Sequence, residues 1–114
     1  MPIWQHAMRL VVDVYQLTAQ LPATERLGLS TSLQQAAVTI PTLLASGSKA
    51  GRSGFQAALL RARQSAAEVE TLLLITQQAY PAVPSDDLLA EASDIQAALT
   101  AMARRLAPQP PKSV

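Results

Sequence analysis

The stretch IWQHAMRLVVDVYQLTAQ, residues 3–20, decides the fold. Its apolar residues recur every three or four positions, the spacing of an α-helix. They form two stripes: one is made of Trp4, Met8, Val11 and Tyr15, and the other of Ala7, Leu10, Val14, Leu17 and Leu21. A helix on the outside of a monomeric bundle needs only one apolar stripe. We therefore expect the stripe that begins at Trp4 to form an oligomer interface; the open alternative is a monomer with an unusually apolar surface.

Three further segments repeat the helical spacing, and the sequence predicts helices over Thr24–Gly47, Ser53–Ala79 and Ser85–Leu106. Pro41 lies inside the first of these segments. A proline in a helix interior removes one backbone hydrogen bond and clashes with the preceding turn. We therefore expect a kink there.

Helix starts are predicted from residues that cap the first turn. Thr24 is expected to cap the second helix, with Glu25 close to its positive end. Ser85 is expected to cap the fourth, with Asp86 and Asp87 in its first turn.

Almost no strand pattern is present, and the connections between helices are short. The sequence therefore predicts an all-α fold, an antiparallel up-down four-helix bundle with a Pro-kinked second helix. The bundle is expected to occupy residues 1–107. Residues 108–114, PQPPKSV, are expected to form a flexible Pro-rich tail.

Composition argues against an enzyme. Cysteine is absent and His6 is the only histidine, which excludes thiolate metal sites, a cysteine nucleophile and most catalytic triads. Glu68 and Glu70 are two residues apart, so they point to different sides of a helix and cannot act as a carboxylate pair. We expect no metal and no cofactor.

The glycine-rich segment GSKAGRS, residues 47–53, is not a phosphate-binding loop. Such a loop needs four residues between its glycines, then a lysine, and a preceding strand. Three residues separate Gly47 from Gly51, Arg52 stands where lysine is required, and a helix precedes them. A flexible basic connection is the better interpretation.

The distribution of charge predicts a basic end of the bundle, although the net charge is only +1. In an up-down bundle the start of helix one, the loop after helix two and the end of helix four share that end. The candidate nucleic-acid-binding residues expected there, without a carboxylate, are Arg9, Lys49, Arg52, Arg61, Arg63, Arg104 and Arg105. Such a surface attracts phosphates without sequence specificity. Plain solvation of these charges, helped at the last two by the helix dipole, is the open alternative.

The N-terminal residues MPIWQHAMRL lack the basic region of a signal peptide, and no apolar run approaches the roughly 18 residues of a membrane span. We expect a cytoplasmic protein with no membrane contact.

The segments WQHAMRLVVDVYQLT, ERLGL, AAVTIP and AEVETLLLI resemble the four-helix-bundle family encoded in intervening sequences of 23S rRNA genes. That family is related to the accessory variability determinant of diversity-generating retroelements. The resemblance implies a homopentameric ring. Members of the accessory type bind nucleic acid and a reverse transcriptase through a basic surface, so RNA, DNA and such a protein are partners that the resemblance implies.

The sequence also departs from the family pattern. Members usually carry two arginines where this chain has Gln34 and Gln35, and Leu43 and Ser46 replace an Asn and a Glu. The missing arginines weaken any transfer of nucleic-acid binding to helix two.

Taken together, these patterns lead us to expect a non-enzymatic, self-assembling scaffold or adaptor that binds nucleic acid at its basic end. The alternative is a pure protein-interaction module with no nucleic-acid binding.

Overall fold

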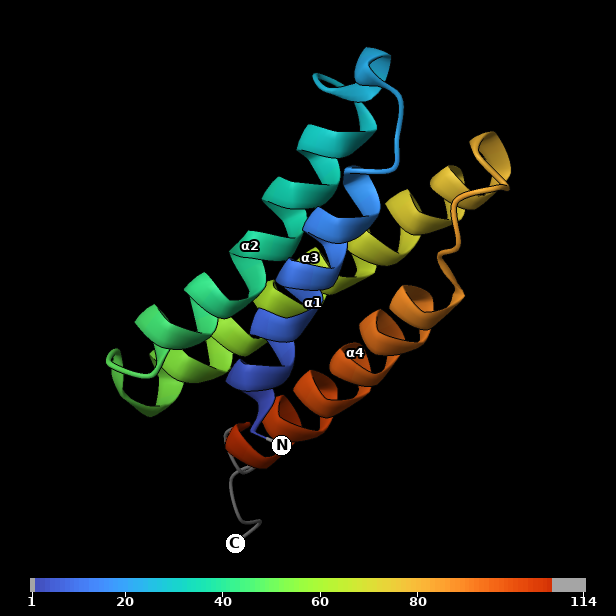
Figure 1. Ribbon diagram of the computed structural model, residues 1–114. Helices are drawn as coiled ribbons and strands as arrows, with labels where there is room; N and C mark the ends of the chain where they lie inside the picture. The colour runs from blue at the N-terminus through green and yellow to red at the C-terminus, as the bar shows by residue number, and fades with distance from the viewer. Residues whose placement is uncertain (1, 108–114) are drawn as a thin grey trace, which may run out of the picture.

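A computed structural model of the chain describes residues 2–107 (Figure 1). Its elements are the helices α1 (Ile3–Thr18), α2 (Leu29–Gly47), α3 (Gly51–Ala79) and α4 (Asp86–Leu106), and the 3-10 turn η1 (Ala23–Glu25). The chain reverses direction at each connection between helices (Figure 1). Each helix packs against the next one along the chain, and α1 also packs against α4, so each helix contacts two others. The predicted all-α four-helix bundle is confirmed.

The core is built from one apolar stripe on each helix. The stripe of α1 that is fully buried is the one containing Leu10 and Val14, and the stripe containing Trp4 stays exposed. Trp4 and Tyr15 keep 45% and 48% of their surfaces accessible. The apolar surplus expected on the first helix is therefore real in the single chain.

Helices α2 and α3 approach each other closely at Gly47. A Cβ atom added to this glycine would lie 2.4 Å from the Cβ of Ala58. Real Cβ atoms essentially never come so close, so only glycine fits while the two backbones keep this spacing. The contact fixes α2 against α3 at the end of the bundle where the basic residues gather.

Pro41 lies inside α2 as expected, and the helix continues through it to Gly47. The proline is buried. The kink predicted at this position stays a prediction.

The start of α2 differs from the prediction. The helix begins at Leu29 rather than after a cap at Thr24, because the 3-10 turn η1 occupies the expected first turn. Glu25 provides the acceptor instead: its Oε1 accepts a hydrogen bond from the backbone N–H of Leu29 at 3.2 Å. The hydroxyl of Tyr80, at the end of α3, donates to the other carboxylate oxygen at 2.5 Å. A contact across 55 positions thus holds this carboxylate in place.

Ser85 precedes α4 as expected but does not cap it. Its backbone has φ −128° and ψ −1°, whereas a capping residue is usually extended. The side chain is 2% exposed, and its hydroxyl has no hydrogen-bond partner within residues 2–107. The start of α3 also differs slightly from the prediction, since the helix begins at Gly51, whose φ of +76° favours glycine, rather than at Ser53.

Two other expectations concern the C-terminal tail and contact with a membrane. The predicted tail, residues 108–114, lies outside the described residues. Within residues 2–107, none of the helices combines the length and the apolar character that crossing a bilayer requires.

Candidate assembly and nucleic-acid interfaces

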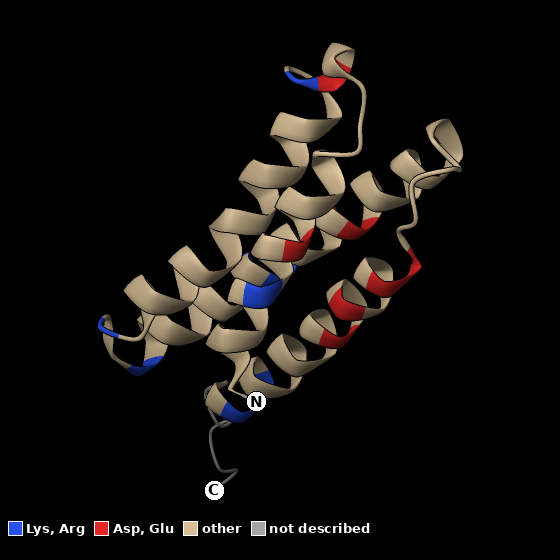
Figure 2. Ribbon diagram, viewed as in Figure 1, with Lys and Arg blue, Asp and Glu red and all other residues tan. Residues whose placement is uncertain are grey.

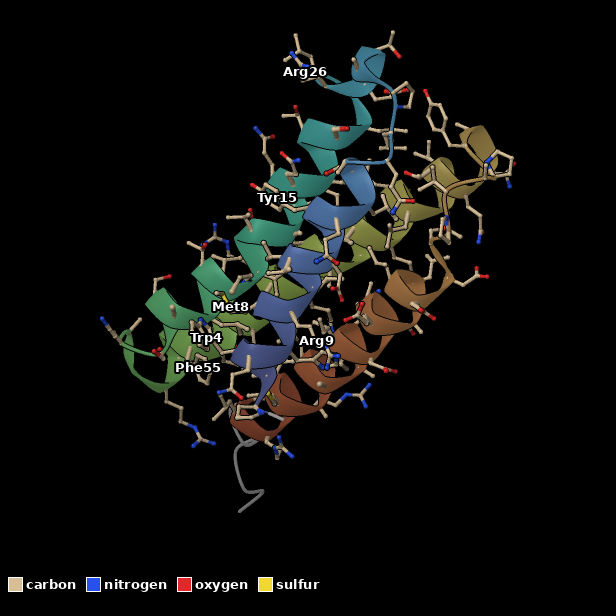
Figure 3. All side chains as sticks on the ribbon, viewed as in Figure 1. Trp4, Met8, Arg9, Tyr15, Arg26 and Phe55 are labelled. Carbon is tan, nitrogen blue, oxygen red and sulfur yellow. The ribbon has the colours of Figure 1, made fainter. Side chains whose placement is uncertain are left out.

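An apolar groove runs between α1 and α2, with a volume of about 630 Å³. From α1 its lining includes Trp4, Met8 and Val11, which are three of the four residues predicted for an oligomer interface. Figure 3 shows Trp4 and Met8 on the side of α1 that faces α2. The remaining lining comes from α2 and from the connection that follows it, and consists of Val38, Pro41, Thr42, Ala45, Ser46 and Lys49. We call this surface the apolar groove.

The α2 side of the apolar groove was missed by the sequence analysis. Val38 and Ala45 are seven residues apart, which places them on one side of a helix, and Pro41 lies between them. This second apolar stripe of α2 was available as a signal. It was overlooked because Ile40 and Leu44, which form the core stripe, alternate with it in the sequence.

Tyr15, the fourth predicted interface residue, lines a separate hollow farther along the contact between α1 and α2. This hollow is more polar. Gln34 Nε2 donates to Thr18 Oγ1 at 3.0 Å, and that hydroxyl donates to the backbone oxygen of Tyr15, also at 3.0 Å. Gln34, one of the two departures from the resembled family, is therefore half-buried and hydrogen-bonded to a residue of the same chain.

Four of the seven predicted nucleic-acid-binding residues lie at one end of the bundle (Figure 2). Lys49 lies in the connection between α2 and α3, Arg52 is in the first turn of α3, and Arg104 and Arg105 are in the last turn of α4. Arg52 Nη2 donates to the backbone oxygen of Arg105 at 3.1 Å, which ties the two sources of charge together. All four side chains are exposed. We call them the basic end.

Arg61 and Arg63 lie on α3, away from the basic end. Arg61 borders a small polar groove between α2 and α3 that Ser65 and Glu68 also line. Arg63 is two residues farther on and half-buried, so it lies on a different side of the helix. The structure does not bring these two arginines together.

Arg9 lies apart from the basic end as well, on the flank of α1 that faces α4 (Figure 3). Burial, followed by a hydrogen bond to Asp13 and its charge, raises the pKa of Glu91 on α4 to about 7, and the positive charge of Arg9 opposes that rise. Arg9 therefore has carboxyl groups as neighbours. The expectation that it shares a carboxylate-free end is wrong, because the contact between α1 and α4 places acidic side chains beside it.

No group of three or more His, Cys, Asp or Glu side chains within residues 2–107 is arranged to hold a metal ion.

The model of the family described as 23S rRNA-intervening sequence protein matches residues 1–101 of this sequence. The chain belongs to this family. The match covers α1, α2, α3 and most of α4, so it includes both sides of the apolar groove and the connection that carries Lys49 and Arg52. No curated protein matches the sequence. The resemblance stated from the sequence is confirmed for this family.

Proposed function

We propose that this member of the 23S rRNA-intervening sequence protein family is a non-enzymatic cytoplasmic protein that assembles with copies of itself into a ring and serves as a scaffold or adaptor. The observation that carries the proposal is the apolar groove between α1 and α2. The number of subunits, five, comes from the family resemblance. A pure protein-interaction module that binds a different partner through the same groove is the second candidate.

The groove suits a protein surface because of its chemistry and its rigidity. Tryptophan, tyrosine and methionine are enriched in the cores of protein interfaces, and Trp4 and Met8 stand exposed along the groove. Both walls are helices whose opposite faces are locked in the core, so little order is lost when the groove is covered. In a ring, this surface would meet a different surface of the next subunit, which is a heterologous contact.

The test replaces Met8 with glutamate and measures the mass of the assembly by light scattering after size exclusion. A charge buried in the interface should convert the oligomer to a monomer whose circular dichroism remains helical. Leu74→Glu is the matched control, since Leu74 is an equally exposed apolar residue on α3, outside the groove. An unchanged mass in Met8→Glu would contradict assembly through the groove. A monomeric wild-type protein would favour the protein-interaction module.

We also propose that the basic end binds RNA or DNA without sequence specificity. Four exposed cations converge there from two segments that are far apart in the sequence, and the hydrogen bond from Arg52 to Arg105 holds the segments together. In a ring of parallel subunits these ends would gather on one face. Release of counterions from the phosphates would then drive binding.

The test compares the double variant Lys49→Gln with Arg104→Gln against Arg26→Gln, the exposed arginine at the opposite end of the bundle (Figure 3). Affinity for structured RNA and duplex DNA is measured between about 50 and 200 mM salt. The double variant should weaken binding to all sequences and reduce the salt slope by about 2, while Arg26→Gln should bind as the wild type does. Equal losses in both variants, or no binding by the wild type, would refute this assignment.

A further inference from the structure

The last turn of α4 lies at the same end of the bundle as the start of the apolar groove. Helices α1 and α4 contact each other and run in opposite directions, so this turn is beside the first turn of α1, which carries Trp4 (Figure 1). The hydrogen bond from Arg52 to the backbone oxygen of Arg105 also holds α4 beside the start of α3, three residues after Lys49. Trp4 and Lys49 both line the groove. Residues 108–114, which we call the Pro-rich segment, therefore begin close to it.

The chain leaves α4 in the conformation of a polyproline II helix. Ala107 has φ −62° and ψ 143°, close to the ideal values for that conformation. The Pro-rich segment reads PQPPKSV, and three of its first four residues are proline. Proline fixes φ near −65° and restricts the residue before it to the extended region. The sequence thus favours continuing the conformation that Ala107 begins.

The apolar groove has the features of a surface that binds polyproline II segments. Domains that recognise such segments use grooves lined with aromatic side chains, and Trp4 is exposed along this groove. The volume of about 630 Å³ suits a segment of a few residues. The side chains of Trp4 and Lys49 offer hydrogen-bond donors only. A proline-rich backbone offers carbonyl acceptors and few N–H groups, so the two surfaces are complementary.

The Pro-rich segment is long enough to enter the groove of its own chain. A polyproline II helix rises about 3.1 Å per residue, so residues 108–114 span about 22 Å. Packed helices lie about 8–10 Å apart, so crossing the start of α1 from α4 uses less than half of this length. The rest of the segment can then lie against Trp4.

We propose that the Pro-rich segment docks in the apolar groove of its own chain as a polyproline II helix, with Pro110 and Pro111 against Trp4, and competes there with the neighbouring subunit. Attachment to α4 gives the segment an effective concentration in the millimolar range, so weak contacts suffice to fill the groove for part of the time. The docked segment raises the protein concentration at which subunits assemble. The competition rests on the assembly proposed above, whereas the docking does not.

The chain allows a direct test of docking because Trp4 is its only tryptophan and it contains no cysteine. Gln109→Cys provides a single site for a bimane label, whose fluorescence is quenched by a tryptophan in contact with it. In the first arm, labelled chains are diluted into an excess of unlabelled Trp4→Phe chains, so each label meets only its own Trp4. In the second arm, labelled Trp4→Phe chains are diluted into an excess of unlabelled wild type, so each label meets only a neighbour's tryptophan.

Docking predicts roughly twofold or greater quenching in the first arm and none in the second. Adding Pro110→Ser and Pro111→Ser to the labelled chain should restore its emission. Ser113→Ala, the matched control in the same segment, should leave the emission quenched. Docking in the chain's own groove is overturned by any of three results: no quenching in the first arm, equal or stronger quenching in the second, or quenching that persists without the two prolines.

Light scattering over a range of protein concentrations then tests the competition. The full chain with Pro110→Ser and Pro111→Ser should assemble at a several-fold lower concentration than the wild type, and Ser113→Ala should assemble as the wild type does. An unchanged concentration dependence in the proline variant would refute the competition. A wild-type protein that stays monomeric would refute the assembly and the competition with it, while the first arm would still decide whether the segment docks.

Discussion

The two flanks of α1 make opposite kinds of contact. Toward α2 the helix presents Trp4 and Met8 to an open apolar groove, and toward α4 it presents Arg9 and Asp13 to a carboxyl group. The stripe between these flanks, which includes Leu10, is fully buried. One helix of 16 residues therefore supports the core, a surface that remains to be covered and a titratable contact.

The difference shows how each contact responds to conditions. The free energy of binding a partner in the apolar groove scales with the apolar area removed from water. This free energy should therefore change little with pH or salt. The contact of Arg9 and Asp13 with Glu91 depends on the protonation of Glu91, and solvent screens its charges, so it should change with pH and salt. A measurement that varies pH alone should separate the two flanks of the same helix.

Removing the shared support should break both flanks together, with the largest effect. Leu10→Ala deletes a fully buried side chain and should cost about 3 kcal/mol of unfolding free energy, from lost burial and the cavity that remains. Urea denaturation measures this cost. Val12→Ala, two residues on and 53% exposed, should change stability by less than about 0.5 kcal/mol. Similar losses in both variants would mean that the core does not centre on Leu10.

A smaller change should disturb α2 and spare the contact between α1 and α4. Gly47→Ala introduces a Cβ 2.4 Å from the Cβ of Ala58, and the repulsion should cost about 2 kcal/mol. Thermal denaturation measures the loss. Combining it with Ala58→Gly removes the atom that clashes and should restore part of the stability. A single variant as stable as the wild type would show that α2 can shift freely against α3.

The tie between Tyr80 and Glu25 should give a smaller effect, which is present at neutral pH and lost in acid. The hydrogen bond from Tyr80, and then the one from the backbone of Leu29, lower the pKa of Glu25 below its ordinary value. The stabilisation is present above the ordinary carboxyl value and is lost as pH falls through the lowered one. Tyr80→Phe should therefore lower stability modestly at neutral pH, and the difference from the wild type should shrink as pH falls through the lowered pKa of Glu25. Urea denaturation at several pH values measures this, and equal stabilities of the two proteins at neutral pH would argue against the tie.

The smallest effect expected is none at all, and it tests whether the two flanks are independent. Trp4 is the only tryptophan, so its fluorescence reports on the apolar groove alone. Emission of the assembled wild type and of Glu91→Gln should coincide between about pH 5.5 and 8. A pH-dependent shift present only in the wild type would show that the titration of Glu91 affects the groove on the other flank of α1.

The helices and the core were predictable because each helix repeats apolar residues at helical spacing without interruption. The stripe of Trp4, Met8 and Val11 was identified from sequence for the same reason, and the structure leaves Trp4 and Met8 exposed and Val11 half-buried. Local patterns of this kind depend only on which residues share a side of one helix. They say little about which side of a neighbouring helix they will meet.

The features that escaped prediction depend on contacts between distant residues. Thr24 was expected to cap α2. The side chain that accepts a hydrogen bond from the start of α2 is instead Glu25, which Tyr80 at the C-terminal end of α3 holds in place. Arg9 was grouped with the basic residues because it lies near a helix start, although the packing of α4 surrounds it with carboxyl groups. Sequence spacing alone could not give either contact. The role of the basic end in binding nucleic acid stays a prediction.

The order in which the bundle forms follows from the absence of contact between α1 and α3 in the described part of the chain. Helices α2, α3 and α4 are consecutive, and short connections join them, so their pairings close small loops and should form early in folding. Helix α1 can pack early against α2, its neighbour in sequence. Its contact with α4, however, closes a loop of nearly the whole chain. We expect that contact to form last, which makes its closure the step that separates a compact intermediate from the finished bundle.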